Sequence, residues 1–97
     1  MTFIQSIQYA TEQPSEIREL LARWTADAIG NGAQRSTLAE DRSAPGHFVL
    51  AVSFESAETA ARNSARAETG AFAEQFTALC SEGPTFREFD VVEVYGS

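Results

Sequence analysis

The sequence predicts a single α+β domain whose elements follow the order β-α-β-β-α-β. Segments with strand-like alternation or continuous apolar character are separated by two stretches in which apolar residues recur at helical spacing. A chain of 97 residues is long enough for one core and too short for two, so residues 1–97 are expected to form one domain. Two βαβ-like halves joined by a hairpin are typical of a ferredoxin-like βαββαβ fold: a four-stranded antiparallel sheet with two helices on one face.

The first half of the chain contains a strand, an amphipathic helix and a second strand. Residues 2–10 are rich in β-branched and aromatic side chains and predict the strand. Pro14 suits the first turn of a helix, and residues 30–32, Gly-Asn-Gly, suit its C-terminal cap. One apolar face of this helix is formed by Ile17, Leu20, Leu21, Trp24 and Ala28. The polar residues 34–42 predict an edge strand.

The second half begins with a central strand that follows a turn at Pro45 and Gly46. Residues 47–55, HFVLAVSFE, are almost continuously apolar, which predicts a strand covered on both faces. Ser56 is expected to N-cap an alanine-rich helix. The alternating residues 85–95 predict the last strand.

The alanine-rich helix is expected to be broken within its length. Its small residues are Ala57, Ala60, Ala61, Ser64, Ala67 and Ala71, and its larger apolar residues are Phe72, Phe76 and Leu79. The two sets point about 100° apart in one straight helix. Gly70 lies at the change of direction, and glycine costs about 1 kcal/mol relative to alanine inside a helix. A kink is therefore predicted between Ala67 and Phe72.

The predicted sheet has one face that its own helices cannot cover. Two helices shield one face only, whereas the central strand carries apolar side chains on both sides. A second copy is the simplest cover, so a homodimer is expected.

Composition excludes several kinds of chemistry and partner. The chain has no lysine, which excludes Schiff-base chemistry and a P-loop lysine. Its net charge of −7 disfavours nucleic acid and anionic membranes as partners. One cysteine and one histidine cannot build a Cys/His zinc site, so no metal is expected. No signal peptide or membrane span is recognised, and a cytoplasmic protein with a small-molecule or protein partner is expected.

Several polar side chains have both a chemical and a structural interpretation. His47 could act as a base near neutral pH or lie solvated at a hairpin end. The i+4 spacing of Glu58, Arg62 and Arg66 indicates a solvated helix face, although two arginines could also bind an acidic substrate. Cys80 is interpreted as a packing residue, since no neighbouring basic residue would activate its thiol.

Asn63 and Trp24 are the main candidates for a binding site. The Asn63 amide could donate to a substrate oxygen or hold a reactive dioxygen species, or it could be an exposed helix asparagine. Trp24 offers a flat aromatic surface and one N–H donor, or it belongs only to the core. We predict that both border one cavity between the helices and the sheet.

The segment HFVLAVSFESAETAARNSARAETGAF resembles the antibiotic biosynthesis monooxygenase family of the dimeric α+β barrel superfamily. Members commonly have a central strand ending in tryptophan, then glutamate, a helix containing histidine, and a second segment bearing phenylalanine. In this sequence Phe54 occupies the tryptophan position, and Glu55 and Ser56 match. Asn63 lies where the histidine usually lies, and Phe72 matches the later aromatic residue.

The resemblance implies a dimeric α+β barrel with a pocket between sheet and helices in each protomer. In some members that pocket supports cofactor-independent oxidation of polycyclic phenols or oxidative opening of haem. Asn63 in place of histidine removes the haem ligand, and the chain has no glycine-rich phosphate loop, so neither haem nor flavin is expected.

Two functions are therefore expected as alternatives. The first is a cofactor-independent monooxygenase acting on a small aromatic or polyketide-like molecule, with Asn63 catalytic and Trp24, Phe54 and Phe72 binding the substrate. The second is a non-enzymatic small-molecule-binding or assembly module whose pocket either is filled by its own side chains or only carries a ligand. The volume of the pocket separates them, because ligand cavities measure roughly 300 to 1,000 Å³.

Overall fold

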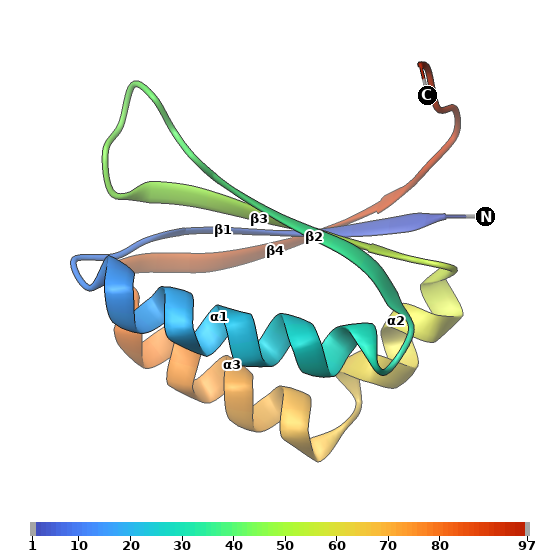
Figure 1. The fold of residues 1–97 in the computed structure, drawn as a ribbon, viewed down its shortest axis with the longest axis horizontal. Helices are drawn as coiled ribbons and strands as arrows, with labels where there is room; N and C mark the ends of the chain where they lie inside the picture. The colour runs from blue at the N-terminus through green and yellow to red at the C-terminus, as the bar shows by residue number, and fades with distance from the viewer. Residues whose placement is uncertain (1, 97) are drawn as a thin grey trace.

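Four antiparallel strands form one sheet, and three helices pack against the same face of it (Figure 1). The computed structural model describes residues 2–96. In chain order the elements are β1 (Phe3–Ala10), α1 (Pro14–Ile29), β2 (Ala33–Glu40), β3 (His47–Phe54), α2 (Ala57–Ser64), α3 (Ala67–Leu79) and β4 (Glu82–Asp90). The strands lie in the order β2-β3-β1-β4. The predicted ferredoxin-like α+β fold is confirmed, with β2 at an edge and the second helix divided in two.

Helix α1 follows the predicted pattern. Pro14 occupies its first turn, and all five residues of the predicted apolar face are buried. The cap residue Gly30 keeps right-handed helical dihedral angles, and it is Gly32 that has a positive φ of 104°. A side chain at Gly32 would also overlap that of Thr59, so glycine is required there on two grounds.

The break in the alanine-rich segment lies at Ala65 and Arg66, so its predicted position between Ala67 and Phe72 is wrong. Gly70 lies inside α3, where a side chain would meet open space, and it does not interrupt the helix. The start of α2 is as predicted: the Ser56 hydroxyl accepts a hydrogen bond from the Thr59 amide at 3.1 Å.

The position of the break follows from which side chains face the sheet. The buried residues are Ala60 and Asn63 in α2, and Thr69 and Phe76 in α3. In one continuous helix these two pairs would point at least about 120° apart. The helix therefore ends between Asn63 and Thr69. Of the predicted small-residue stripe only Ala60 is buried, so that stripe faces outward as a whole.

The core between sheet and helices is built around aromatic rings. Phe76 of α3 is fully buried, with its ring centroid 4.8 Å from that of Tyr9 and 5.5 Å from that of Trp24. Phe54, at the end of β3, is also buried to 1% exposure. These rings join both long helices to the two central strands.

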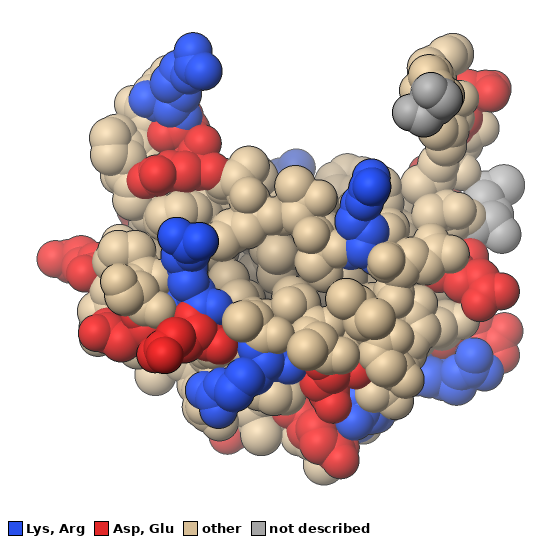
Figure 2. Space-filling model, viewed as in Figure 1, with Lys and Arg blue, Asp and Glu red and all other residues tan. Residues whose placement is uncertain are grey.

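The other face of the sheet carries no helix of residues 2–96 (Figure 1). Val49 and Ala51 of β3 point to this face and are half-buried. The molecule is hollowed there, between the β2–β3 loop and the C-terminal segment; the floor of the hollow is mostly uncharged, and charged side chains stand on its rims (Figure 2). Within this single chain, β3 is therefore covered on one face only.

The last strand ends at Asp90, so its predicted extension to Tyr95 is wrong. Asp90 pairs with Phe3, the first residue of β1, and the Val91 amide donates to the Thr2 carbonyl at 3.0 Å. Because β1 begins at Phe3, it has no further residue with which the residues after Val91 could pair. The strand-forming residues Val92, Val94 and Tyr95 are consequently exposed, and the C-terminal segment rises toward the uncovered face (Figure 1).

No helix within residues 2–96 combines the length and apolar character needed to cross a membrane.

Replacing Phe76 by alanine should lower the free energy of unfolding by about 3 to 5 kcal/mol, because the side chain is fully buried between two aromatic rings. Phe89→Ala is the matched control, since Phe89 lies in β4 and remains 47% exposed. Urea denaturation of both variants measures the difference. Equal losses would contradict the assignment of Phe76 to the centre of the core.

Candidate functional site

A small cavity lies between the sheet and all three helices. Its walls come from β1, β3, α1, α2 and α3, and they include Trp24, Phe54 and Asn63. Its volume is about 30 Å³. That is the share of a single water molecule in liquid water and about a tenth of the smallest typical ligand cavity. In this conformation the space is therefore largely filled by the protein's own side chains.

The structure brings three of the four predicted site residues to this cavity. Trp24, Phe54 and Asn63 line it, from α1, β3 and α2 respectively. Phe72 does not line it, but its ring stacks on that of Trp24, with centroids 6.1 Å apart and planes 15° apart. The expected common border of Asn63 and Trp24 is therefore present, and their roles toward a substrate remain predictions.

Asn63 is buried, with 5% of its surface exposed, so its interpretation as an exposed helix asparagine is wrong. Its backbone carbonyl accepts a hydrogen bond from the Thr69 hydroxyl at 2.7 Å, which ties the end of α2 to the first turn of α3. Its side-chain oxygen Oδ1 accepts from Arg66 Nη1 at 3.4 Å. Within residues 2–96 the amide nitrogen Nδ2 donates to no protein group, and Asn63 is one of the residues that line the cavity.

The i+4 spacing predicts that Arg66 lies on a solvated helix face, and for this residue the prediction is wrong. Its guanidinium binds both carboxylate oxygens of Asp27 in α1, at 2.6 and 3.3 Å, and both side chains are only about a quarter exposed. The hydrogen bond from Arg66 lowers the pKa of Asp27, and the same bond raises the pKa of Arg66. Arg62 does lie in solvent, 3.7 Å from Glu58.

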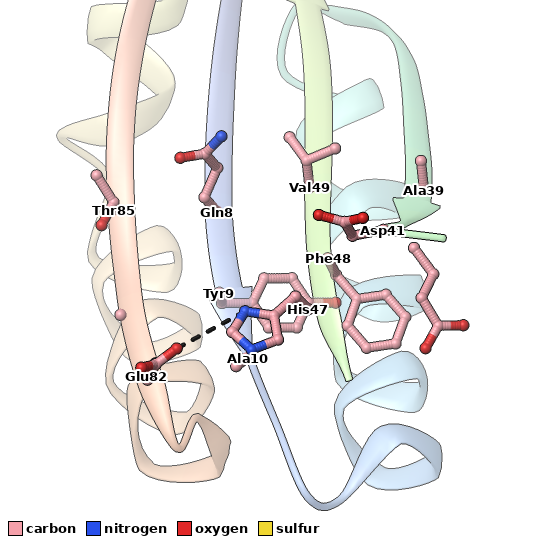
Figure 3. Close-up of a pocket in the computed structure, with 12 residues that line it drawn as sticks. Gln8, Tyr9, Ala10, Ala39, Asp41, His47, Phe48, Val49, Glu82 and Thr85 are labelled. Carbon is pink, nitrogen blue, oxygen red and sulfur yellow. Dashed lines mark ion pairs between the residues drawn. The ribbon is translucent and has the colours of Figure 1, made fainter. Parts of the chain in front are cut away.

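A larger pocket of about 480 Å³ lies on the opposite, uncovered face of the sheet (Figure 3). His47 and Glu82 line it, with His47 Nδ1 3.7 Å from Glu82 Oε2, and both are well exposed. Ala10 lies between them and pairs with both residues in the sheet register. Sequence reasoning missed Glu82, Gln8 and Thr85 as neighbours of His47, because only the strand pairing brings them together.

No cluster of three or more histidine, cysteine, aspartate or glutamate side chains within residues 2–96 is arranged to hold a metal ion.

Tyr9 is a core residue whose phenol has no hydrogen-bond partner within residues 2–96. Burial, with a smaller contribution from Cys80, raises the pKa of Tyr9 to about 12. Burial also raises the pKa of the Cys80 thiol, which donates to the Phe76 carbonyl at 3.2 Å. Both groups stay protonated at neutral pH, and the packing interpretation of Cys80 agrees with this environment.

The stability of the fold should fall above pH 10 because of Tyr9. An exposed phenol in the unfolded chain ionises near its ordinary pKa of about 10, while the folded phenol holds its proton to about pH 12. Between these values the unfolded state binds fewer protons, so alkali favours unfolding. Tyr9→Phe should remove this loss, and Tyr95→Phe, at an exposed position, should not. Urea denaturation at pH 8 and pH 11 measures the effect. Identical pH dependence of Tyr9→Phe and the unchanged protein would contradict it.

Comparison with known proteins identifies relatives by structure alone. No protein-family model and no curated protein matches the chain. Among solved structures, a cofactor-independent oxygenase from Streptomyces nogalater, SnoaB, superposes with a TM-score of 0.87 at 17% identity, covering 99% of this chain and 98% of that one. Its N63A mutant superposes with a TM-score of 0.84 at 20% identity, covering 99% and 96%.

A protein from Nitrosomonas europaea, described as a candidate antibiotic biosynthesis monooxygenase, superposes with a TM-score of 0.82 at 13% identity. The alignment covers 98% of this chain and 94% of that one. At these identities the likeness concerns the fold. The chain therefore shares the ferredoxin-like α+β fold of these solved structures.

Proposed function

We propose that the protein is a cofactor-independent monooxygenase that oxidises a small aromatic or polyketide-like molecule in the inner cavity. The observation that carries the proposal is the buried residue Asn63, which lines the cavity with Trp24 and whose amide nitrogen donates to no protein group within residues 2–96. An amide donor without a protein partner, at the edge of an aromatic-lined cavity, can bind a substrate oxygen or an oxygen-derived atom. The shared fold with an oxygenase described as cofactor-independent adds support.

The reaction proposed needs no reductant besides its substrate. A phenol-activated methylene, as in a hydroxyanthrone, ionises to an electron-rich anion that reduces dioxygen and then bonds to it. The resulting peroxide loses water and leaves a carbonyl. Four electrons pass from the carbon to dioxygen, one oxygen atom enters the product, and the other leaves as water with the two methylene hydrogens.

The protein's part is to orient the anion and to stabilise negative charge as it moves to oxygen. Asn63 would donate its amide to the substrate oxygen or the bound peroxide. Trp24 and Phe54 would contact the aromatic rings of the substrate. Phe72 would hold the Trp24 ring in position by stacking on it. Because the cavity measures about 30 Å³, admission of such a substrate requires these side chains and helices to move apart.

Asn63→Ala should reduce the rate of dioxygen consumption with 1,8-dihydroxyanthrone by roughly a hundredfold, as removal of a donor to a developing oxyanion typically does. Asn31→Ala is the control, because Asn31 is the chain's other asparagine and is exposed. An oxygen electrode follows the reaction above the uncatalysed rate. Equal rates for both variants would overturn the role of Asn63, and no turnover above background for the unchanged protein with this and related phenols would overturn the proposed function.

The small cavity favours a second candidate, a non-enzymatic small-molecule-binding or assembly module. Its pocket would serve mainly as core, and its function would reside in what the uncovered face contacts. Native mass spectrometry of the purified protein distinguishes the two: a retained ligand without dioxygen consumption would support a binding module.

We also propose that the protein is a homodimer formed through the uncovered sheet face. Half-buried Val49 and Ala51 lie on that face, and the C-terminal segment that follows β4 projects toward the same side. A second copy would cover Val49 and Ala51 and would contact the C-terminal segment.

Light scattering after size-exclusion chromatography should therefore report twice 10.5 kDa, or about 21 kDa. Ala51→Arg, which places a charge on the uncovered face, should yield monomers. Ala61→Arg, on the exposed side of α2, should leave the dimer intact. A monomer for the unchanged protein at micromolar concentration would refute the proposal.

A further inference from the structure

We infer that Arg66 is a positioning residue that sets the direction of the Asn63 amide, with Asp27 holding Arg66 in place. The catalytic consequence of this arrangement rests on the proposed function, whereas the arrangement itself does not. Arg66 lies at the break between α2 and α3, and its Nη1 contacts both Asp27 Oδ2 and Asn63 Oδ1. One guanidinium thus joins α1 to the residue that faces the cavity.

The chemistry of the guanidinium decides which way the amide points. Arginine carries only hydrogen-bond donors, so it can bind the oxygen of an asparagine side chain but not its NH₂ group. With Oδ1 held 3.4 Å from Arg66 Nη1, the Nδ2 group is turned away from Arg66, and a reversed amide would place donors against donors. The two N–H bonds of Asn63 are therefore kept available to a molecule in the cavity.

Asp27 makes this arrangement rigid. Its carboxylate binds the guanidinium through two nitrogens, Nη1 at 2.6 Å and Nη2 at 3.3 Å, which fixes the plane of the arginine as well as its position. Glu68 adds a weaker contact, 3.7 Å from Arg66 Nη2. Asp27 lies on α1 one turn after Trp24, so the same helix supplies the aromatic wall and the anchor of Arg66.

The side-chain ¹⁵N–¹H resonances of Asn63 give a direct test, because they are identified by their loss in Asn63→Ala. In Arg66→Gln the chemical shifts of these resonances should move toward those of an asparagine side chain without a fixed orientation. Circular dichroism should show that the fold is retained. Arg66→Lys keeps the positive charge but has one nitrogen in place of the two that bind Asp27, so the shift of the Asn63 resonances should be intermediate. Arg62→Gln is the matched control, since it removes an exposed arginine one turn away and should leave the resonances unchanged.

Kinetics with 1,8-dihydroxyanthrone extend the test to catalysis. Arg66→Gln should lower kcat roughly ten- to a hundredfold with a smaller change in KM, because a misplaced donor costs rate more than binding. Added to Asn63→Ala, it should cause little further loss, since the group it positions is already absent. Losses that multiply would show that Arg66 acts on the substrate independently and would overturn the inference.

The two readouts separate failure of the inference from failure of the proposed function. If Arg66→Gln leaves the Asn63 resonances unchanged, Arg66 does not position the amide, whatever the activity. If the resonances move as expected but the unchanged protein consumes no dioxygen, the positioning is upheld and the oxygenase proposal falls.

Discussion

The structure depends on one constraint: the alanine-rich segment between β3 and β4 must bury two sets of side chains that a single helix cannot turn toward the same sheet. Ala60 and Asn63 on one side and Thr69 and Phe76 on the other would point at least about 120° apart in a continuous helix. A break at residues 65 and 66 removes the conflict. Phe76 can then complete the aromatic core, whose large buried area is the main favourable term in folding.

The same break builds the candidate site. It places Arg66 outside both helices, where its guanidinium can reach Asp27 and Asn63 together. The Thr69 hydroxyl donates to the Asn63 carbonyl and so joins the two helices across the break. The oxygen of this buried asparagine is thereby hydrogen-bonded, while its nitrogen donates to no group in the described part of the chain. On the opposite face of the sheet, the larger pocket contains His47 and Glu82.

The sequence predicts most of the fold because local patterns determine most of its elements. The α1 face around Trp24 and the cap at Ser56 depend on nearest neighbours in the chain and are found as expected. The predicted position of the break is wrong because it depends on Gly70, whereas the inward directions of Asn63 and Thr69 determine where the helix ends. The Arg66–Asp27 pair, the end of β4 at Asp90 and the contact between His47 and Glu82 depend on tertiary packing or strand register, which periodicity does not contain.

We propose that the cavity lined by Trp24 and Asn63, rather than the pocket lined by His47, receives the aromatic ligand. The single tryptophan and the single histidine of the chain make one NMR titration decisive. A hydroxyanthraquinone, the non-reacting product of the anthrone oxidation, should shift the indole N–H of Trp24 and the side-chain amide of Asn63 and leave the His47 ring signals unchanged. Shifts confined to His47, or no saturable shift at all, would contradict the account.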